Sequence, residues 1–411
     1  MLAPKIVIMK RRYIEEIIKT LALKNNKMAF ISGPRQSGKT TLAKILMTEE
    51  STHKYFNWDD PVFRRQWIKD PKVLISDVRL AVFDEIHKAK NWKRNLKGIY
   101  DTLEEKCKII VTGSARLNVY KKGGDSLLGR YLNFRLHPFT VGELLRTTPM
   151  SPDGSLKHMF ADQKYNLGHD SEQILKRLLK FGGFPEPYLK QSKEYLNLWQ
   201  IGRSEKIVKE DLRDLSRIPE LNQVEALMSM LPERAANPLS IQSLREDLEI
   251  AHDTAQRYIK YLKELYYIFE IKPYSKVIPR SIKKEGKLYL WDWSEVPTEG
   301  EKFENLVASH LLKACDYWTD SGHGAFKLFY LKNKQKKEID FLIVRDNKPW
   351  VAVECKSGKE EPSPNFKIFL QYIKCDYAIQ ILNKPNVWEK IRIENTQLII
   401  GSASRVLSYL P

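Results

Sequence analysis

Short apolar runs separated by amphipathic stretches dominate the first third of the chain. The runs 28–32, 80–83 and 108–112 have the length and the β-prone content of buried strands, and the stretches between them keep helical spacing. Strands that alternate with helices predict an α/β fold, in which helices cover the faces of a parallel sheet.

The pattern changes twice further along the chain. A polar stretch with Pro149, Pro152 and Gly154 predicts a linker. Residues 171–270 are mostly helical in pattern, with a break at 181–185, and from Lys287 onward the pattern is α+β. There we expect strands at 288–291, 339–344 and 350–354. These changes predict four regions, with boundaries at 1–150, 151–236, 237–285 and 286–411.

Composition narrows the class of protein. Apolar residues make up 42% and aromatic residues 11% of the 411 residues, which excludes wholesale disorder. No apolar run is long enough for a transmembrane helix, and the first residues lack a signal-peptide core. The four cysteines lie far apart, which argues against a disulfide framework and a zinc finger. We expect a multidomain cytoplasmic protein without a membrane partner.

A glycine-rich loop follows the first predicted strand and precedes a predicted helix. It fits the phosphate-binding pattern G-x-x-x-x-G-K-[ST] in the strand–loop–helix context that this pattern requires. Glycines let backbone N–H groups surround phosphates, Lys39 can reach the β and γ oxygens, and Thr40 can bind Mg²⁺. The expected nucleotide-binding residues are Gly33, Pro34, Arg35, Gln36, Ser37, Gly38, Lys39, Thr40 and Thr41.

Two carboxylates end the second predicted strand, 80–83. We expect Asp84 to hold Mg²⁺ and Glu85 to orient or deprotonate the attacking water. The third strand ends near Ser114, which is placed to face the γ-phosphate because parallel strands end at one edge of the sheet. Downstream, Arg130 is a candidate arginine finger, acting in its own subunit or a neighbouring one.

A family resemblance extends over nearly the whole chain. In this order, the chain contains GPRQSGKTTL, VFDEIHK, VTGSARL, LLGRY and HPFTVGEL, followed by GGFPEP at 182–187 and LYLWD at 288–292. These motifs resemble the AAA-type (AAA_14-like) P-loop ATPases of bacteria and archaea that carry a C-terminal DUF4143 region. The resemblance implies ATP hydrolysis, a AAA+-like domain, a winged-helix segment and a restriction-endonuclease-like C-terminal domain.

Two other readings of the nucleotide motifs fit less well. Asp84-Glu85-Ile86-His87 also matches a DExH helicase box, but a helicase needs a second RecA-like domain, and no second parallel-sheet pattern follows. The guanine signature N-K-x-D is absent, so we expect ATP rather than GTP.

The segment 239–265 has the pattern of a helix–turn–helix. Ser240 and Asp253 are candidate caps of its two helices, and residues 267–273 could begin a wing. Arg257, Lys260 and Lys263 are the candidate contacts to nucleic acid. Residues 237–276 carry six basic and six acidic residues, however, so a packing or protein-interaction role is the stronger alternative.

A predicted hairpin near the C-terminus carries a second group of charges. Centred on Asn347, it places Asp340 opposite Glu354, close enough to share a divalent metal, and puts Lys356 on the same face as Glu354. Two carboxylates and a lysine suit a Mg²⁺-dependent phosphodiesterase. The pattern is similar to (P)D…(D/E)xK nucleases, and Glu304 matches the preceding acidic position of that family. A salt-bridged hairpin without catalysis is the alternative.

Three functions are compatible with these sequence motifs. The first is an ATP hydrolase, with Mg²⁺, that acts on or is regulated by nucleic acid. The second is an ATP-regulated Mg²⁺-dependent nuclease, and the third is a nucleotide-switched DNA-binding protein with little turnover. A homo-oligomer or a protein partner is possible for each of them.

The basic charge has an uneven distribution. The 69 Lys and Arg residues exceed the 51 Asp and Glu residues by 18, and residues 1–150 carry +14 of this excess. Lys90, Lys93, Arg94 and Lys97 have the spacing of one basic helix face. If nucleic acid binds, we expect salt-sensitive contacts there.

Overall fold

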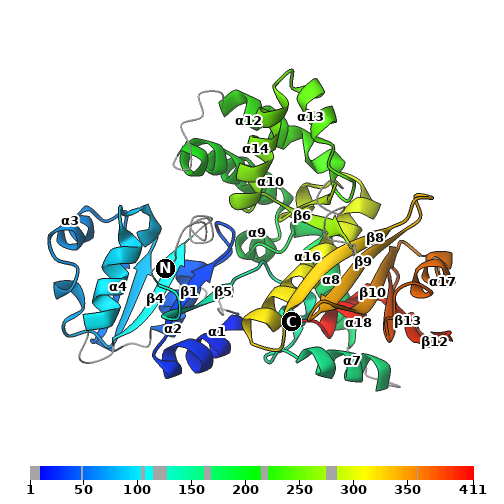
Figure 1. The fold of residues 1–411 in the computed structure, drawn as a ribbon, viewed down its shortest axis with the longest axis horizontal. Coiled ribbons are helices and arrows are strands. Elements are labelled where there is room, and N and C mark those ends of the chain that lie inside the picture. Colours follow the sequence, from blue (N-terminus) through cyan, green and yellow to red (C-terminus); the bar gives the residue numbers. More distant parts are fainter. Residues whose placement is uncertain are drawn as a thin grey trace, which may run out of the picture.

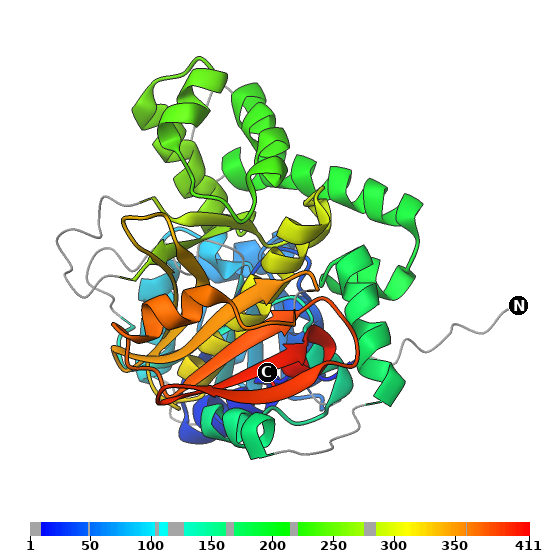
Figure 2. The same cartoon turned by 90° about the vertical axis from the view of Figure 1, so that its right-hand side faces the viewer.

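The computed structural model describes residues 10–47, 50–102, 107–113, 127–161, 168–213, 221–274, 285–358 and 360–411. Two β-sheets lie at opposite sides of the molecule, and a helical region rises above them (Figure 1). In the perpendicular view the second sheet lies in front and the helical region projects from it (Figure 2).

The first sheet has five parallel strands in the order β2-β3-β4-β1-β5. Its strands are β1 (Met28–Ser32), β2 (His53–Asn57), β3 (Leu80–Asp84), β4 (Lys108–Gly113) and β5 (Tyr131–Arg135). The predicted strands 28–32, 80–83 and 108–112 correspond to β1, β3 and β4, which are buried almost throughout. The predicted α/β fold with a parallel sheet is confirmed.

Helices cover both faces of this sheet. The helical segments are α1 (Ile14–Ile17), η1 (Ile18–Ala22), η2 (Leu23–Asn25), α2 (Lys39–Leu46), α3 (Pro61–Lys69), η3 (Val73–Ile75), η4 (Ile86–Lys88), α4 (Trp92–Thr102) and α6 (Val141–Leu145). Side chains alternate between the two faces of a strand. Phe30 of β1 accordingly packs in the core beneath α3 and α4, whereas Ile31 packs in the core beneath α1 and α2.

The middle of the chain is helical. Its segments are α7 (Pro152–Ala161), α8 (Gly168–Phe181), α9 (Pro185–Lys190), α10 (Lys193–Lys206), η5 (Ile207–Leu212), α12 (Leu221–Met230), η6 (Pro232–Arg234), α13 (Ile241–Asp247) and α14 (His252–Glu264). Helix α7 occupies the stretch where composition predicted a linker. Pro152 stands at its start, where the missing N–H costs nothing, and the Ser151 hydroxyl accepts a hydrogen bond from Gly154 N at 3.1 Å.

The predicted helix–turn–helix is present as α13 and α14. Ser240 caps α13 as expected, through a hydrogen bond from Ser243 N at 3.2 Å. Asp253 does not cap α14, because that helix already begins at His252. The segment expected to begin a wing is strand β6 (Ile268–Pro273), which pairs with two strands of the second sheet, and the wing itself stays a prediction.

The second sheet has eight strands in the order β12-β13-β11-β10-β9-β8-β6-β7. Besides β6 these are β7 (Lys287–Leu290), β8 (Phe326–Lys332), β9 (Glu338–Arg345), β10 (Lys348–Lys356), β11 (Tyr377–Leu382), β12 (Trp388–Ile393) and β13 (Thr396–Ser402). Its helical segments are η7 (Trp293–Glu295), α16 (Glu299–Asp320), α17 (Pro364–Leu370) and α18 (Ala403–Ser408). Helices α16 and α18 pack on one face and α17 on the other.

The two sheets share one hydrophobic core. The cluster that contains Ile31 of β1 also contains Leu311 of α16 and Val353 of β10. Helix α16 contacts β5 of the first sheet as well as β8, β9 and β10 of the second. Helix α16 therefore packs against both sheets and connects them.

Candidate nucleotide-binding site

The phosphate loop connects β1 to α2, as its motif requires. Gly33 has φ +154°, and a Cβ there would lie 2.3 Å from the carbonyl oxygen of Leu136, so only glycine fits. Gly38, at the start of α2, has φ +97°, a conformation that side chains disfavour. The loop therefore needs its glycines for close packing and for its sharp entry into the helix.

Polar groups in the loop are available for a ligand. The Ser37 hydroxyl is buried, and no hydrogen-bond partner for it exists among the described residues. Buried polar groups normally have partners, so an unpaired hydroxyl inside a phosphate loop fits an anionic ligand. Thr41 is exposed on the first turn of α2.

Lys39 is buried and folded back onto its own loop. Its Nζ donates hydrogen bonds to the carbonyl oxygens of Gly33 at 3.0 Å and Pro34 at 2.7 Å. Burial lowers the pKa of Lys39, although Glu85 and Asp84 act to raise it. The lysine thus lies beside the loop, with two carboxylates near it.

Asp84 lies at the centre of a hydroxyl network at the carboxyl end of β3. It accepts a hydrogen bond from the Thr40 hydroxyl at 2.8 Å, and the hydroxyls of Tyr55 and Thr112 also donate to it. A threonine hydroxyl and a carboxylate are the oxygen ligands that Mg²⁺ uses beside phosphates. The residues present therefore fit a nucleotide-bound Mg²⁺.

Glu85 adopts an unusual backbone conformation beside Asp84. Its φ of 57° is left-handed, which is uncommon for a residue other than glycine and often occurs at functional sites. Burial, together with the charge of Asp84, raises the pKa of Glu85 to about 7 despite the attraction of Lys39. His87 Nε2 lies 3.4 Å from the Glu85 carboxylate. A carboxyl with a pKa near neutrality is suited to accept a proton from water.

The structure does not bring Arg130 to this site. Its backbone oxygen accepts a hydrogen bond from Met28 N at 2.9 Å, at the amino end of β1, whereas the phosphate loop follows the carboxyl end. Five residues of strand separate the two positions by about 16 Å. Its side chain pairs with Asp101 at 2.6 Å. The prediction that Arg130 acts within its own subunit is therefore wrong, and the alternative role across a subunit interface stays a prediction. Ser114 lies outside the described residues.

Comparison with protein families agrees with this geometry. Residues 25–145 match the family model of an AAA domain, AAA_14, and residues 299–395 match a domain of unknown function, DUF4143. The chain combines an AAA domain with a DUF4143 domain. Residues 172–296 match a further domain of unknown function, DUF8612. The resemblance of the sequence motifs to this family is thereby confirmed.

Similar proteins occur in bacteria and archaea. An uncharacterized protein of Mycobacterium tuberculosis is 22% identical over 346 residues, which cover 80% of this chain and 70% of the relative. An uncharacterized protein of Methanocaldococcus jannaschii is 23% identical over 399 residues, covering 85% and 81%.

Two solved structures overlap partly with this chain. DnaA of Aquifex aeolicus, bound to AMPPCP, has a TM-score of 0.26 and 18% identity, covering 61% of this chain and 86% of its own. RuvB of Thermotoga maritima has a TM-score of 0.30 and 17% identity, covering 62% and 88%. The family model and the strand order carry the assignment of the AAA domain.

A buried charge network anchors the AAA domain to α16, and sequence reasoning missed it. Arg12 donates to the Ser37 carbonyl oxygen of the phosphate loop at 2.9 Å and pairs with Glu143 at 3.0 Å. Glu143 also pairs with Lys313 of α16 at 2.6 Å. Burial acts to raise the pKa of Glu143, but Arg12 and Lys313 lower it to about 2. The network connects the phosphate loop to the DUF4143 domain.

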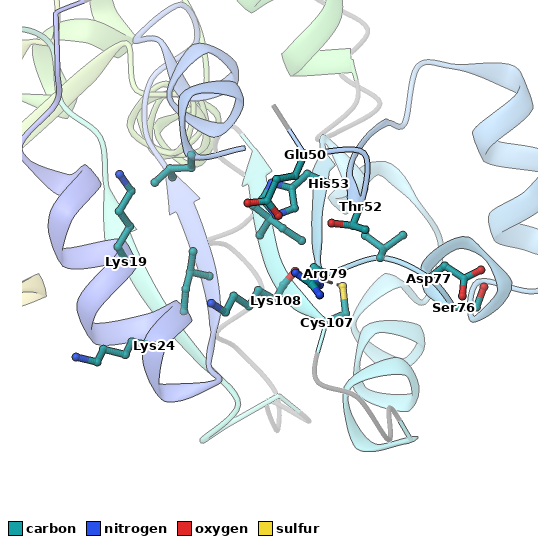
Figure 3. A pocket seen from close by; sticks show the side chains of 14 residues that line it. Lys19, Lys24, Glu50, Thr52, His53, Ser76, Asp77, Arg79, Cys107 and Lys108 are labelled. Atoms are coloured by element: carbon teal, nitrogen blue, oxygen red, sulfur yellow. Dashed lines mark hydrogen bonds and ion pairs between the residues drawn. The ribbon is translucent and has the colours of Figure 1, made fainter. Parts of the chain in front are cut away.

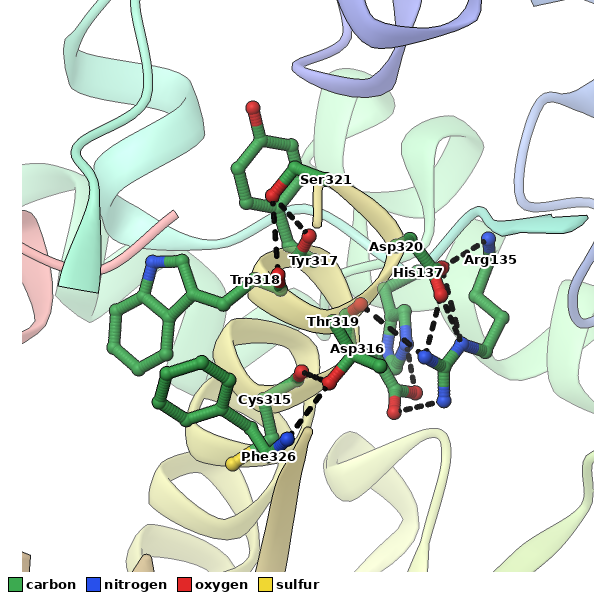
Figure 4. A network of polar contacts seen from close by, with 10 residues as sticks. All are labelled: Arg135, His137, Cys315, Asp316, Tyr317, Trp318, Thr319, Asp320, Ser321 and Phe326. Carbon is green, nitrogen blue, oxygen red and sulfur yellow. Dashed lines mark hydrogen bonds and ion pairs between the residues drawn. The ribbon is translucent and has the colours of Figure 1, made fainter. Parts of the chain in front are cut away.

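A second polar network crosses the same interface (Figure 4). Arg135, at the end of β5, pairs with Asp320 at 2.6 Å and also with Asp316 on α16. His137 Nε2 lies 2.8 Å from Asp316, and burial lowers the pKa of this histidine. Burial of Arg135 and His137 between the domains makes the interface polar and specific.

A separate cleft lies at the other end of the first sheet. It has a volume of about 800 Å³ and opens between the helices that precede β1 and the amino ends of β2, β3 and β4 (Figure 3). Leu23, Lys24, Arg79 and Lys108 are among the residues that line it. Because the phosphate loop lies at the carboxyl ends of the strands, this cleft is not the nucleotide site.

The hairpin of the DUF4143 domain differs from the predicted register at its turn and reaches that register only beyond a bulge. Asp346 and Asn347 form its turn with φ 49° and 62°, as a two-residue type I′ turn requires. The register shifts by one residue near Trp350 and then pairs Val353 with Phe341. Extended by one residue, this shifted register places Asp340 opposite Glu354.

A lysine that the sequence did not indicate lies among these carboxylates. Lys287 is only 2% exposed, and its Nζ lies 2.8 Å from Glu338, 3.1 Å from Glu304 and 3.8 Å from Asp340. Burial, Glu304 and Glu354 raise the pKa of Asp340 well above its ordinary value.

The other predicted pair, Glu354 and Lys356, is in contact. Lys356 Nζ lies 2.8 Å from Glu354 Oε1, and the Ser363 hydroxyl donates to the same oxygen at 3.0 Å. In the described part of the chain, no group of three or more acidic, histidine or cysteine side chains is arranged to hold a metal ion. With an ammonium group already among the carboxylates, these residues do not fit Mg²⁺ as they stand.

Among the described segments, no helix is both long enough and apolar enough to cross a membrane.

Proposed function

We propose that this protein is a Mg²⁺-dependent ATP hydrolase. The observation that carries the proposal is the contact between Thr40 of the phosphate loop and Asp84, with Lys39 and Glu85 beside it. In this proposal Lys39 and Thr40 bind the phosphates and their Mg²⁺, with Asp84 as a further Mg²⁺ ligand. Glu85 accepts the proton of the attacking water. Mg²⁺ supplies charge stabilisation of the phosphates when it is bound.

Nucleotide binding and phosphate release test this proposal together. Purified full-length protein is expected to bind ATP and release phosphate only with Mg²⁺, and Lys39→Ala is expected to lose both activities. Tight ATP binding without turnover would instead favour the nucleotide-switched binding protein.

We further propose that the ATPase acts on nucleic acid or is regulated by it. The support is the charge of residues 1–150, part of which lies on α4 at Lys93, Arg94 and Lys97. Two of the three predicted contacts on α14 lie near carboxylates. Lys263 pairs with Glu270 at 2.7 Å and Lys260 lies 3.9 Å from Glu264, whereas Arg257 is exposed.

The Mg²⁺-dependent nuclease remains the alternative, with less support. Its residues Glu304, Asp340, Glu354 and Lys356 lie in one region, but Lys287 already neutralises part of their charge. Cleavage that requires Asp340 and persists in Lys39→Ala would establish this alternative.

A further inference from the structure

One arginine of the phosphate loop is held from outside the AAA domain. Arg35 lies 2.7 Å from Glu210 and 3.0 Å from Asp211, both on η5, which continues α10 of the helical region. Asp211 and Arg35 are 176 residues apart in sequence. The contact therefore joins two separate parts of the fold.

Asp211 lies close enough to the nucleotide residues to affect them. Its carboxylate lies 3.0 Å from the Arg35 guanidinium of the phosphate loop, two residues before Ser37. Its side chain is 17% exposed, against 55% for Glu210. Asp211 is thus the inner member of the pair and faces the site, whereas Glu210 lies at its edge.

A carboxylate pair and a triphosphate compete for the same positive charges. Arg35 and Lys39 belong to the loop that receives phosphates, yet Arg35 is paired with carboxylates and Lys39 is bonded to loop carbonyls. A triphosphate brings several negative charges into this site, so it repels Asp211 and attracts both cations.

We propose that Glu210 and Asp211 form an electrostatic latch, which holds η5 on the phosphate loop until a nucleoside triphosphate takes over Arg35. The latch rests on the proposed function, since it requires nucleotide at the phosphate loop. Because η5 continues α10, its release frees one end of the helical region. The latch therefore converts nucleotide binding into movement of the helical region.

Binding of a fluorescent ATP analogue with Mg²⁺ tests the latch in the full-length protein. Asp211→Asn keeps the shape and removes the charge, so its affinity is expected to rise about fivefold or more over wild type. Glu210→Gln, at a more exposed position, is expected to raise affinity less. Asp247→Asn breaks a comparable ion pair with Arg234 in the helical region and should leave affinity unchanged.

Hydrogen exchange of the amides in 207–213 provides a second readout. In wild type, ATP is expected to accelerate exchange in this segment, and in nucleotide-free Asp211→Asn the exchange is expected to be fast already. Equal or lower ATP affinity in both latch variants, or exchange that ATP does not change, overturns the latch. If wild type and Lys39→Ala bind ATP equally or not at all, the proposed function itself fails.

Discussion

At the scale of single residues, the environment of Glu85 determines whether this carboxylate can act as the base in ATP hydrolysis. Its burial beside Asp84 gives Glu85 a pKa of about 7, well above that of an exposed glutamate. A base of this pKa is about half ionised at pH 7, and its ionised form accepts a proton readily.

The pH dependence of ATP hydrolysis should reflect this pKa. Because Glu85 accepts a proton only when ionised, we expect kcat/KM to fall about tenfold per unit as the pH drops below 7. Above pH 8 it should level off. Steady-state kinetics from pH 5.5 to 8.5 measure this profile, and Glu85→Gln should lack the inflection. A flat profile in wild type would argue against Glu85 as the base.

Motif residues were predictable one by one, whereas their distant partners were not. Lys39, Thr40 and Asp84 follow from local spacing, since strand–loop–helix geometry fixes their positions. Arg12 and Lys313 carry no local signal, because their role depends on contacts 131 and 170 residues away in sequence. The position of Arg130 could not be predicted either, because its neighbours in sequence do not indicate at which end of the sheet it lies.

At the scale of elements, buried strands were predictable and exposed junctions were not. Strands β1, β3 and β4 are apolar because both sheet faces are covered, which makes their runs easy to recognise. Proline and glycine at 149–154 suggested a linker, but Pro152 starts α7. The segment expected to begin a wing is strand β6, and its pairing with β8 of the second sheet could not be predicted from local pattern.

The Gly182-Gly183 break between α8 and α9 allows close packing of three segments. Gly183 O accepts a hydrogen bond from Phe139 N at 2.7 Å, and a Cβ at Gly183 would lie 2.4 Å from the Trp293 ring. Gly183→Ala is therefore expected to destabilise the protein by about 1–3 kcal/mol, measured by thermal unfolding.

A matched substitution in α10 provides the control. A Cβ at Gly202 would meet no atom within 4 Å, so Gly202→Ala should be neutral or stabilise by about 0.5–1 kcal/mol. Equal effects of the two substitutions would contradict the packing argument.

At the scale of the whole molecule, the AAA and DUF4143 domains form one unit. They share a hydrophobic core, and the Arg12–Glu143–Lys313 network and the Arg135 contacts cross their interface at α16. A change at the phosphate loop can therefore reach the DUF4143 domain through a rigid helix.

The uneven distribution of charge over the molecule predicts where nucleic acid would bind. If nucleic acid binds, replacing Lys93, Arg94 and Lys97 of α4 by Glu should weaken binding. The slope of the logarithm of the binding constant against the logarithm of the salt concentration should become less negative by about 2–3. Reversing Arg257, Lys260 and Lys263 of α14 should have a smaller effect. Fluorescence anisotropy with labelled DNA and RNA measures both, and a larger loss from the α14 variant would contradict the assignment.

The central claim is that the Asp84–Glu85 pair turns nucleotide binding into hydrolysis. Phosphate release from ATP by wild type and by Glu85→Gln, with ATP affinity measured on the same samples, tests it most directly. We predict Mg²⁺-dependent turnover in wild type, and a fall of about 100-fold or more in Glu85→Gln at nearly unchanged ATP affinity. Equal turnover in the two proteins, or ATP binding without turnover in wild type, would contradict the claim.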